Sequence, residues 1–491
     1  MYQFSRDVTR QFGKQGYHVD AYQSTRGSTS ALGSLAQLLS NTPEALRLRQ
    51  LVIDRQTPCF EPASSSWATA SKLLDAKFSL NEDQRAAIQC VFQSRDFVLI
   101  QGLPGTGKTA TLVALVVALT AQNLSVLVTS HTNAAVDNLL RQVKTRGLSM
   151  LRLGPRCHED LQQYGEEKLR DQAQTPEHLQ ALFDATLVVG VTCTTAAQHW
   201  VLRRRKFDVC LIDEATQVPL PATVAPLLSA KRFVLVGDPR QLQPVVVNQR
   251  AKELGMGETM FERLQSCSEA IATLGLQYRM NRVLCELANN LTYDGLLRCA
   301  NEDVANATLK LTSKLPEATL SKFPWLARAL SCEIEHSALF LDVGRSSTED
   351  SEGTSKREAS IVKALVHFFL QCGVPGDQVG VMSPFRAQVQ LLHSMLGSRP
   401  GLEVSTVDQF QGRDKLVAVL SCVKSFPEEQ QEPKERDGIL NDPKRLTVAV
   451  TRSRVKLLIV GDAQSLSGAY DPCRRLLGAL GPKRVITLRL S

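Results

Sequence analysis

One stretch, residues 97–110 with the sequence FVLIQGLPGTGKTA, constrains the fold of this chain more than any other. Its first four residues are apolar, which predicts a buried parallel strand, and a glycine-rich loop follows directly. In a loop with this spacing, successive backbone N–H groups point inward and form a concave anion site. The residues expected around a phosphate chain are Gly102, Pro104, Gly105, Thr106, Gly107, Lys108 and Thr109. The stretch predicts a P-loop within an α/β fold.

The end of the loop supplies the chemistry of phosphate binding. Lys108 brings a positive charge to the outer phosphates, and the Thr109 hydroxyl is a ligand for Mg²⁺. The helix that begins there adds its positive dipole end. A glycine turn with a surface lysine is the alternative, but the apolar sequence LVALVVAL after the loop predicts a buried helix and favours the P-loop.

Composition limits the partners and the compartment. The 491 residues predict two or three domains, and the net charge of +8 is compatible with a polyanionic partner without requiring one. The 12 cysteines are scattered without a CxxC pair, which indicates reduced thiols in an intracellular protein. The longest apolar stretch is too short to cross a bilayer, and the first residues lack an apolar signal core. We expect neither a membrane protein nor a secreted one.

Residues 1–74 carry no recognisable chemistry. Leucines recur at helical spacing between residues 32 and 48, while EPASSSWATAS, residues 61–71, has the composition of a linker. We expect a short, mainly helical N-terminal segment that is a remnant of a larger upstream region.

A helix is expected at residues 80–92, just ahead of the P-loop strand, with Asn81 as its N-cap. Gln84 in this helix stands where a side-chain amide can pair with an adenine edge, donor to acceptor and acceptor to donor. A solvent-exposed surface glutamine is the alternative.

Hydroxyl and amide side chains follow two further apolar runs, at residues 125–130 and 187–192. In an open parallel sheet, ligands bind beyond the carboxyl ends of the strands. For the residues that follow the first of these runs, turn and helix N-cap chemistry is the alternative. The residues expected to contact a ligand there are Thr129, Ser130, Asn133, Thr192 and Thr195.

Acids end the next apolar run, residues 207–212. Asp213 stands where a P-loop enzyme holds Mg²⁺, and Glu214 beside it can orient and deprotonate an attacking water. The following run, residues 232–237, ends near Gln241, whose amide can reach a γ-phosphate and report its presence. A solvated pair of acids is the alternative for residues 213 and 214.

The second half repeats this architecture without a P-loop. Apolar runs at residues 271–280, 338–343, 378–388, 416–423 and 455–462 predict a second parallel core. We therefore expect a first lobe at residues 75–270 and a second lobe at residues 271–491.

The ordered motifs GLPGTGKT, DEATQ, GDPRQLQP, LQYRM, VDQFQGRD and RLTVAVTRSR resemble those of superfamily 1 helicases, in the subgroup of the nonsense-mediated-decay RNA helicase. Within it, LNEDQRAAI, VVVNQRAKELGMGETMFERL, LTYDGLLRC, VANATLKL and QGRDK are more similar to the eukaryotic DNA replication helicase/nuclease family. The resemblance covers essentially the whole chain. The sequence departs from the usual motifs at Pro239, Gln243 and Thr447. These departures bear on the fine coupling of the motor more than on ATP hydrolysis.

The resemblance implies two tandem RecA-like lobes with ATP and Mg²⁺ between them. It also implies that Arg279 and Arg452 reach across the cleft, where a planar guanidinium suits the spread charge of a transferring phosphoryl group. Lys108, Glu214, Gln241, Arg279 and Arg452 are then the expected catalytic residues, and Glu358 matches a family acid.

In the second lobe the resemblance places a nucleic-acid face at the corresponding strand ends. Hydroxyl and basic groups there can hold phosphates, and Phe385 can stack on a base, with a core position as its alternative. The expected DNA contacts of this lobe are Pro384, Phe385, Arg386, Thr406 and Gln411, with Ser383 beside them.

The implied activity is ATP-dependent 5′ to 3′ movement on single-stranded or flapped DNA, in replication, Okazaki flap processing, repair and end resection. The resemblance also implies a single-strand-binding protein as partner and a nuclear location, with the mitochondrion as a second compartment. An RNA helicase of the same subgroup is one alternative, because phosphate contacts do not distinguish the sugars. A nucleotide-gated DNA-binding scaffold that does not unwind is another.

The family also carries a nuclease and a four-cysteine 4Fe-4S site upstream of the motor. Only Cys59 and Cys90 precede the P-loop here, and four thiolates are needed for a cluster. We expect that this 491-residue chain binds no iron and does not cleave flap DNA.

Overall fold

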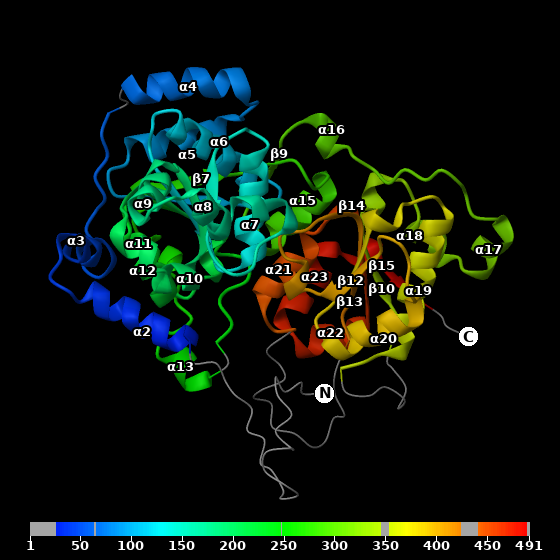
Figure 1. The fold of residues 1–491 in the computed structure, drawn as a ribbon. Coiled ribbons are helices and arrows are strands. Elements are labelled where there is room, and N and C mark those ends of the chain that lie inside the picture. Colours follow the sequence, from blue (N-terminus) through cyan, green and yellow to red (C-terminus); the bar gives the residue numbers. More distant parts are fainter. Residues whose placement is uncertain (1–25, 63–64, 247, 345–352, 424–439, 489–491) are drawn as a thin grey trace, which may run out of the picture.

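The computed structural model describes residues 26–62, 65–246, 248–344, 353–423 and 440–488, and the structural statements below refer to these residues. Two sheets lie side by side in Figure 1, each surrounded by helices. All neighbouring strands within the two large sheets run parallel. The predicted two-lobed α/β fold is confirmed.

The first sheet has seven strands in the order β3-β4-β2-β5-β6-β1-β7. Residues of β1 alternate between two cores: Phe97 and Leu99 face one cluster, and Val98 and Ile100 face another on the opposite side. Because both faces are covered, the strand is a continuous apolar run. In sheet order the strands are Met150–Arg152, Val188–Thr192, Val126–Ser130, Phe207–Asp213, Ala230–Gly237, Phe97–Gly102 and Ile271–Leu274.

Helices of this lobe cover the sheet and connect its strands. The longest of them, α6, is buried along most of its length, as its apolar sequence predicts. The helices are α5 Glu82–Gln93, α6 Lys108–Thr120, α7 Asn133–Lys144, α8 Glu166–Gln172, α9 Pro176–Ala185, α10 Cys193–Gln198, α11 Trp200–Arg204, α12 Leu220–Leu228, α13 Gln249–Glu253 and α14 Met260–Leu264.

The second sheet has six strands in the order β12-β11-β13-β14-β10-β15. In that order they are Glu403–Thr406, Val379–Ser383, Lys415–Ser421, Ser453–Gly461, Ala338–Asp342 and Val485–Thr487. Its helices are α15 Arg282–Ala288, α16 Glu302–Ala305, α17 Glu317–Lys322, α18 Trp325–Ala329, α19 Lys356–Gln371, α20 Arg386–Leu396, α21 Pro443–Val450, α22 Ala463–Ala469 and α23 Asp471–Leu480. Apolar clusters again fill both faces.

Strand β7 belongs to the first sheet, although the sequence analysis assigned residues 271–280 to the second half. It pairs with β1 in parallel, from Leu99 opposite Ile271 to Gly102 opposite Leu274. An apolar run indicates that a segment forms a strand, but it does not indicate with which sheet the strand pairs. A separate parallel pair, β8 Leu276–Gln277 and β9 Arg298–Cys299, follows. We propose that the chain passes to the second lobe after Leu274.

The N-terminal helices α2 Arg26–Leu38, α3 Pro43–Val52 and α4 Ser65–Lys77 pack against the first lobe. Most of the stretch predicted to be a linker is helical, since α4 begins at Ser65. Tertiary contacts hold it there: the Trp67 ring lies 5.8 Å from the Phe92 ring, and Gln122 Nε2 donates to the Ser66 carbonyl at 2.6 Å. These contacts outweigh the weak helix propensity of the serines.

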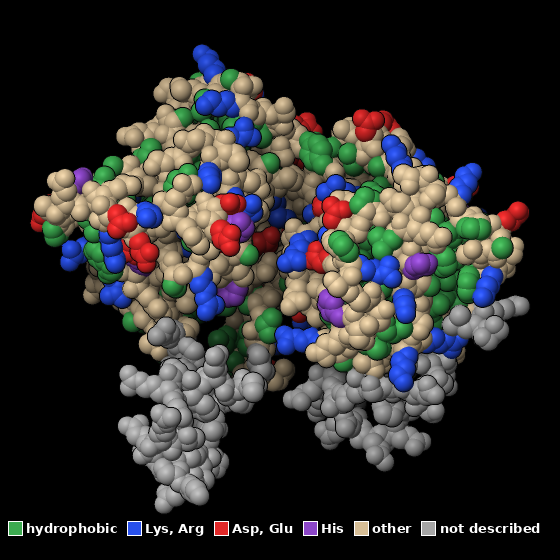
Figure 2. All heavy atoms as spheres, turned by 45° about the vertical axis from the view of Figure 1, so that its right-hand side comes forward, with side chains coloured by type: hydrophobic (Ala, Val, Ile, Leu, Met, Phe, Trp, Pro, Cys, Tyr) green, Lys and Arg blue, Asp and Glu red, His purple; other side chains and the backbone are tan. Residues whose placement is uncertain are grey.

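A furrow separates the two halves of the molecule in Figure 2, and both basic and acidic side chains lie along its edges. Side chains of both lobes meet across this boundary, as detailed below. Of the helices described, none is long and apolar enough to span a membrane.

Candidate functional site

The glycine-rich loop forms the cradle that the sequence predicts. Gly105 and Gly107 have positive φ angles of 75° and 77°, which favour glycine. A Cβ on Gly102 would lie 2.2 Å from Lys108 Cγ, and one on Gly107 would lie 2.7 Å from Gln84 Nε2. Lys108 Nζ donates to the Gly102 carbonyl at 2.9 Å, and α6 begins at Lys108. Backbone N–H groups, a lysine and a helix N-terminus therefore converge as a triphosphate requires.

Gln84 is tied to this loop. It is buried, its Nε2 donates to the Thr106 carbonyl at 3.0 Å, and its Oε1 accepts from Asn81 N at 3.2 Å in a capping box. The predicted surface alternative is wrong, while the adenine contact stays a prediction. Asn81 Nδ2 donates to the hydroxyl of Tyr278, an exposed ring that sequence reasoning did not single out.

Asp213 ends β5, close enough to Lys108 for their charges to interact. Burial, and then the charge of Glu214, raises the pKa of Asp213 to about 7 against the attraction of Lys108. The attraction of Lys108 therefore offsets only part of the cost of burying this carboxylate. Together with the partly buried Thr109 hydroxyl at the start of α6, it matches the oxygen donors that Mg²⁺ prefers.

Glu214 adopts a left-handed conformation with φ 51°. Its backbone N–H donates to Asp213 Oδ1 at 2.9 Å, and its carboxylate accepts from Gln217 Nε2 at 3.1 Å. A non-glycine residue in this conformation is uncommon and costs about 1 kcal/mol or more. The backbone thus turns sharply between the two acids and gives them different surroundings.

Gln241 is buried in the loop after β6. Its Nε2 donates to Asp238 Oδ2 at 2.9 Å, and its Oε1 lies 3.5 Å from Arg452 Nη2 of the second lobe. Asp238 also accepts from the Tyr293 hydroxyl at 2.7 Å. Sequence reasoning singled out Gln241 but missed Tyr293, since no pattern links Tyr293 to Asp238, which lies 55 positions away.

Arg279 lies against the P-loop, because a Cβ on Gly105 would be 2.6 Å from its own Cβ. Its Nε donates to Asp414 Oδ2 at 3.0 Å, and Gln277 Oε1 accepts from its backbone N at 2.9 Å. Burial lowers its pKa, against the attraction of Asp414. Asp414 and Gln277 are contacts that sequence reasoning did not assign.

Arg452 is almost fully buried. Its Nε donates to the Val448 carbonyl at 2.8 Å, and its Nη2 donates to Thr451 Oγ1 at 2.8 Å. Burial, and then the charge of Arg279, lowers the pKa of Arg452 to about 9. The two arginines are therefore electrostatic neighbours, and both stand at the boundary with the first lobe.

The strand-end group of the first lobe is only partly accessible. Thr129 is fully buried with its hydroxyl 3.3 Å from the Cys193 thiol, so this structure does not bring it to the surface. Thr192 caps α10, and its hydroxyl donates to Thr195 Oγ1 at 2.9 Å, so both side chains already have partners within the protein. Ser130 Oγ is buried without a hydrogen-bond partner in the described part of the chain.

Asn133 is exposed at the start of α7. Its Oδ1 accepts from Arg152 Nη2 at 2.7 Å, and the buried Arg152 also pairs with Asp137 at 2.6 Å. The arginine fixes the amide so that its nitrogen can face outward. Arg152, which sequence reasoning passed over, thus holds the Asn133 side chain, while the ligand contact of Asn133 stays a prediction.

In the second lobe, Arg386 is exposed at the first turn of α20, while Phe385 is partly buried against the apolar core. Thr406 ends β12 and is partly exposed, and Gln411 Oε1 is buried without a partner among the described residues. Pro384 is partly exposed, whereas Ser383 is fully buried. Glu358 is buried and accepts from Val423 N at 3.1 Å, which indicates a structural contact.

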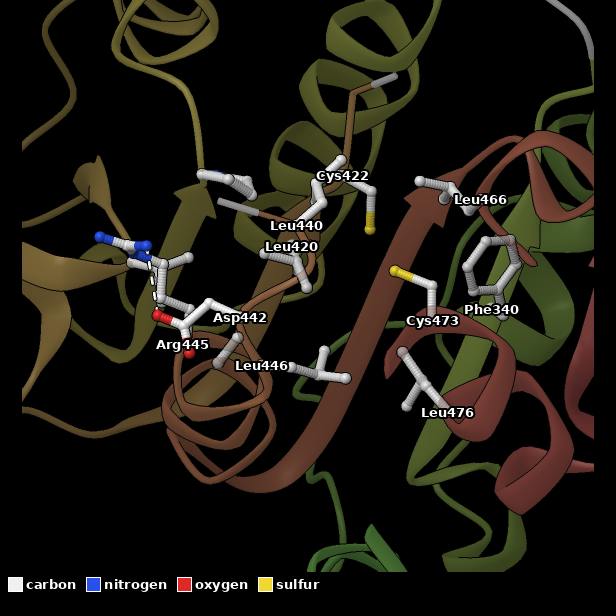
Figure 3. Close-up of a pocket in the computed structure, with 13 residues that line it drawn as sticks. Phe340, Leu420, Cys422, Leu440, Asp442, Arg445, Leu446, Leu466, Cys473 and Leu476 are labelled. Atoms are coloured by element: carbon white, nitrogen blue, oxygen red, sulfur yellow. Dashed lines mark hydrogen bonds and ion pairs between the residues drawn. The ribbon is translucent and has the colours of Figure 1, made fainter. Parts of the chain in front are cut away.

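An apolar cavity of about 30 Å³ lies inside the second lobe (Figure 3). Leucines, Phe340, Cys422 and Cys473 line it, and its two charged residues, Asp442 and Arg445, pair with each other at 3.2 Å. It is too small and too apolar for a nucleotide. Among the described residues, no three His, Cys, Asp or Glu side chains cluster as a metal site.

The chain is similar to known sequence families and to solved structures. Two sequence families, each described as an AAA domain, match residues 79–184 and 158–249, and residues 256–464. The arterivirus nonstructural protein 10 helicase, a solved structure, aligns with a TM-score of 0.39 at 15% identity, covering 79% of this chain and 64% of that chain.

The curated relatives are more similar. The DNA replication ATP-dependent helicase/nuclease DNA2 of Bos taurus is 36% identical over 493 residues, covering 96% of this chain and 45% of the relative. The protein of that name from Homo sapiens is 35% identical over 497 residues, with the same coverage. In Arabidopsis thaliana, the DNA replication ATP-dependent helicase/nuclease JHS1 is 36% identical over 429 residues, covering 86% of this chain and 31% of the relative.

The chain therefore spans less than half of the length of these relatives, and nearly all of it matches them. The resemblance drawn from its motifs is confirmed. By these matches, the chain belongs to the DNA replication ATP-dependent helicase/nuclease family and corresponds to the part that carries the P-loop.

Proposed function

We propose that this chain is an ATP-driven motor that moves along single-stranded DNA and unwinds it. One observation carries the proposal: the P-loop lysine, the acid pair and Gln241 of the first lobe meet Arg279 and Arg452 of the second at one boundary. A simple phosphate-binding module does not need arginines from another lobe, whereas ATP hydrolysis that depends on lobe closure does need them.

Each side chain has a distinct task in this proposal. Lys108 and the loop N–H groups bind the outer phosphates, and Thr109 with Asp213 would hold Mg²⁺, which neutralises charge on the phosphate oxygens. Glu214 accepts the proton of the attacking water. Gln241 contacts the terminal phosphate, while Arg279 and Arg452 stabilise charge that develops during transfer.

The DNA strand crosses the carboxyl ends of both sheets. Exposed Asn133 and Arg386 offer an amide and a guanidinium on the two lobes, with Thr195 and Thr406 beside them. As the lobes close on nucleotide and open after hydrolysis, the two sets of contacts hold the strand in turn. The output is stepwise movement, for which we propose 5′ to 3′ polarity as in the family.

The wider assignments are also proposals. We propose flapped DNA as a substrate, a single-strand-binding protein as a partner, and the nucleus as the location, with the mitochondrion as a second compartment. We propose that the nuclease in the relatives' names, and the 4Fe-4S site expected from the resemblance, lie in the parts of the longer proteins that this chain does not match. That this chain neither binds iron nor cleaves flap DNA stays a prediction.

The test compares ATP hydrolysis by the purified chain with matched single-stranded DNA and RNA oligomers. We expect strong stimulation by DNA, loss of hydrolysis in Lys108→Ala, and a fall in kcat of about 10²–10⁴-fold in Glu214→Gln with nucleotide binding retained. The amide of that variant keeps the shape of the glutamate but cannot accept a proton.

Other results would favour other functions. Equal stimulation by RNA would support an RNA helicase, and nucleotide-dependent DNA binding without turnover would support a scaffold. Hydrolysis indifferent to any nucleic acid would rule out a motor.

A further inference from the structure

A short turn of the second lobe contacts the Gln241 loop of the first. The turn is η4, a π-helical segment at Asn289–Tyr293 that continues α15, and Asp294 ends it with φ 52°. Thr292 Oγ1 lies 2.8 Å from Thr447 Oγ1 of α21, and Arg475 Nη2 of α23 donates to the Leu291 carbonyl at 3.0 Å. The turn is thereby fastened to three helices of the second lobe and must move with them.

The opposite side of the turn holds the first lobe at two points. The Tyr293 hydroxyl donates to Asp238 Oδ2 at 2.7 Å. Arg240 Nη1 donates to Asp294 Oδ2 at 2.8 Å and to the Thr292 carbonyl. The loop after β6 is therefore clamped by the second lobe on either side of Pro239.

Asp238 passes this contact on to Gln241. The same carboxylate oxygen, Oδ2, accepts from Tyr293 Oη and from Gln241 Nε2, the latter at 2.9 Å. All three side chains are at most 4% exposed, so water cannot readily replace a lost partner. The amide nitrogen of Gln241 carries two hydrogens, and one of them is donated to Asp238. The same hydrogen bond therefore also fixes the direction of the second hydrogen.

We propose that Tyr293 is a positioning residue that makes the orientation of the Gln241 amide depend on the place of the second lobe. With the lobes together, Tyr293 and Gln241 share Asp238, and the second amide hydrogen is aimed for the terminal phosphate. When the second lobe withdraws, Asp238 loses the Tyr293 hydroxyl and Gln241 Oε1 loses Arg452 Nη2, so the amide keeps only its bond to Asp238 and its orientation is less fixed. This inference rests on the proposed function and names how hydrolysis is tied to lobe closure.

A tyrosine suits this task better than other residues. Its ring is fully buried in the apolar cluster of the second lobe, which anchors it, and its hydroxyl reaches the neighbouring lobe. Buried tyrosine hydroxyls need a partner, and here the partner is a charged group that forms a strong hydrogen bond. Phenylalanine would fill the same space and lack only this bond.

Tyr293→Phe tests the proposal in the whole chain. We expect DNA-stimulated kcat to fall about tenfold, the scale of one hydrogen bond to a charged group, while KM for ATP and DNA affinity change less than about twofold. Tyr470→Phe is the matched control, because Tyr470 is buried in the same cluster but belongs to the junction of α22 and α23, not to η4. It should leave kcat unchanged.

A double variant asks whether Tyr293 acts through Gln241. Tyr293→Phe should cause no further loss of kcat when added to Gln241→Ala, whereas independent effects that multiply would overturn the proposal. Unchanged kcat in Tyr293→Phe, or an equal loss in Tyr470→Phe, would also overturn it.

Two further checks keep the outcomes separate. Should Tyr293→Phe fail to fold by circular dichroism, Asp238→Asn replaces it, since that change keeps the shape and weakens the shared acceptor. A wild-type chain without DNA-stimulated hydrolysis would refute the proposed function instead of this coupling.

Discussion

At the scale of single residues, Asp213 links the stability of the fold to the binding of a cation. Its pKa is raised to about 7 by burial first and by Glu214 second, so the folded state holds a proton that the unfolded state has released above its ordinary pKa of 3.8. Stability from this group is complete below that ordinary value and is lost as the pH rises through the folded pKa. A bound cation would reverse this penalty.

Asp213→Asn should remove this pH dependence. Without Mg²⁺ or nucleotide, we expect the variant to melt at a higher temperature than the wild type at pH 8, because it carries no buried charge there. At pH 5 the wild-type carboxyl is protonated in the folded state, so the difference should be smaller, and it should reach zero only below the ordinary pKa of 3.8. The difference in melting temperature between the two proteins, followed from pH 5 to 8, measures this.

The matched control is Asp471→Asn, an exposed acid at the start of α23. Its effect should be small and should not follow the same pH course. If the difference in melting temperature between Asp213→Asn and the wild type stays constant from pH 5 to 8, then Asp213 is not protonated in the folded state.

Sequence reasoning found the charged residues of the site but not those that orient them. Lys108, Asp213 and Glu214 follow apolar runs at recognisable spacing, which a pattern can detect. Gln277 and Tyr293 act through contacts that exist only after folding. Burial is likewise a tertiary property, and it removes the Thr129 hydroxyl from the surface on which its position at a strand end had placed it.

At the scale of elements, two differences between the predicted and the observed strands and helices also arise from contacts that exist only after folding. Strand β7 was recognisable as a strand, but its pairing with β1 depends on which sheet edge is open. Helix α4 was hidden because serines favour turns and caps, and only contacts with α5 and α6 make the segment helical. Sequence periodicity therefore predicts those helices and strands whose apolar pattern lies within their own residues.

The packing of α4 can be tested through Trp67. Trp67→Ala removes a partly buried ring from Phe92 and should lower the free energy of unfolding by about 2 kcal/mol in urea titrations. Leu32→Ala, at a side chain 68% exposed on α2, is the control and should change it by less than about 0.5 kcal/mol. Equal effects of the two changes would show that α4 does not pack on the lobe as described.

At the scale of the whole molecule, basic side chains along the furrow and a net charge of +8 create an attractive surface for a polyanion. The polar strand ends of both sheets add uncharged donors on the two lobes. Contacts with phosphate release counterions, so binding of single-stranded DNA should weaken steeply with salt.

We expect the logarithm of the DNA binding constant to fall linearly with the logarithm of salt concentration, by about 0.7 for each phosphate neutralised. Arg386→Ala should reduce this slope by about that amount, because it removes one such contact. Fluorescence anisotropy at several salt concentrations measures both slopes. Arg474→Ala, at an exposed side chain of α23, is the control, and a loss of slope there equal to that of Arg386→Ala would argue against a strand path over α20.

The left-handed backbone at Glu214 also bears on protein engineering. Glycine would adopt φ 51° without the steric cost that a glutamate carries, so the substitution should make the chain harder to melt. It would also delete the carboxylate that we assign to water activation. A selection for heat resistance alone would therefore favour an inert protein, and libraries built on this scaffold should hold position 214 constant.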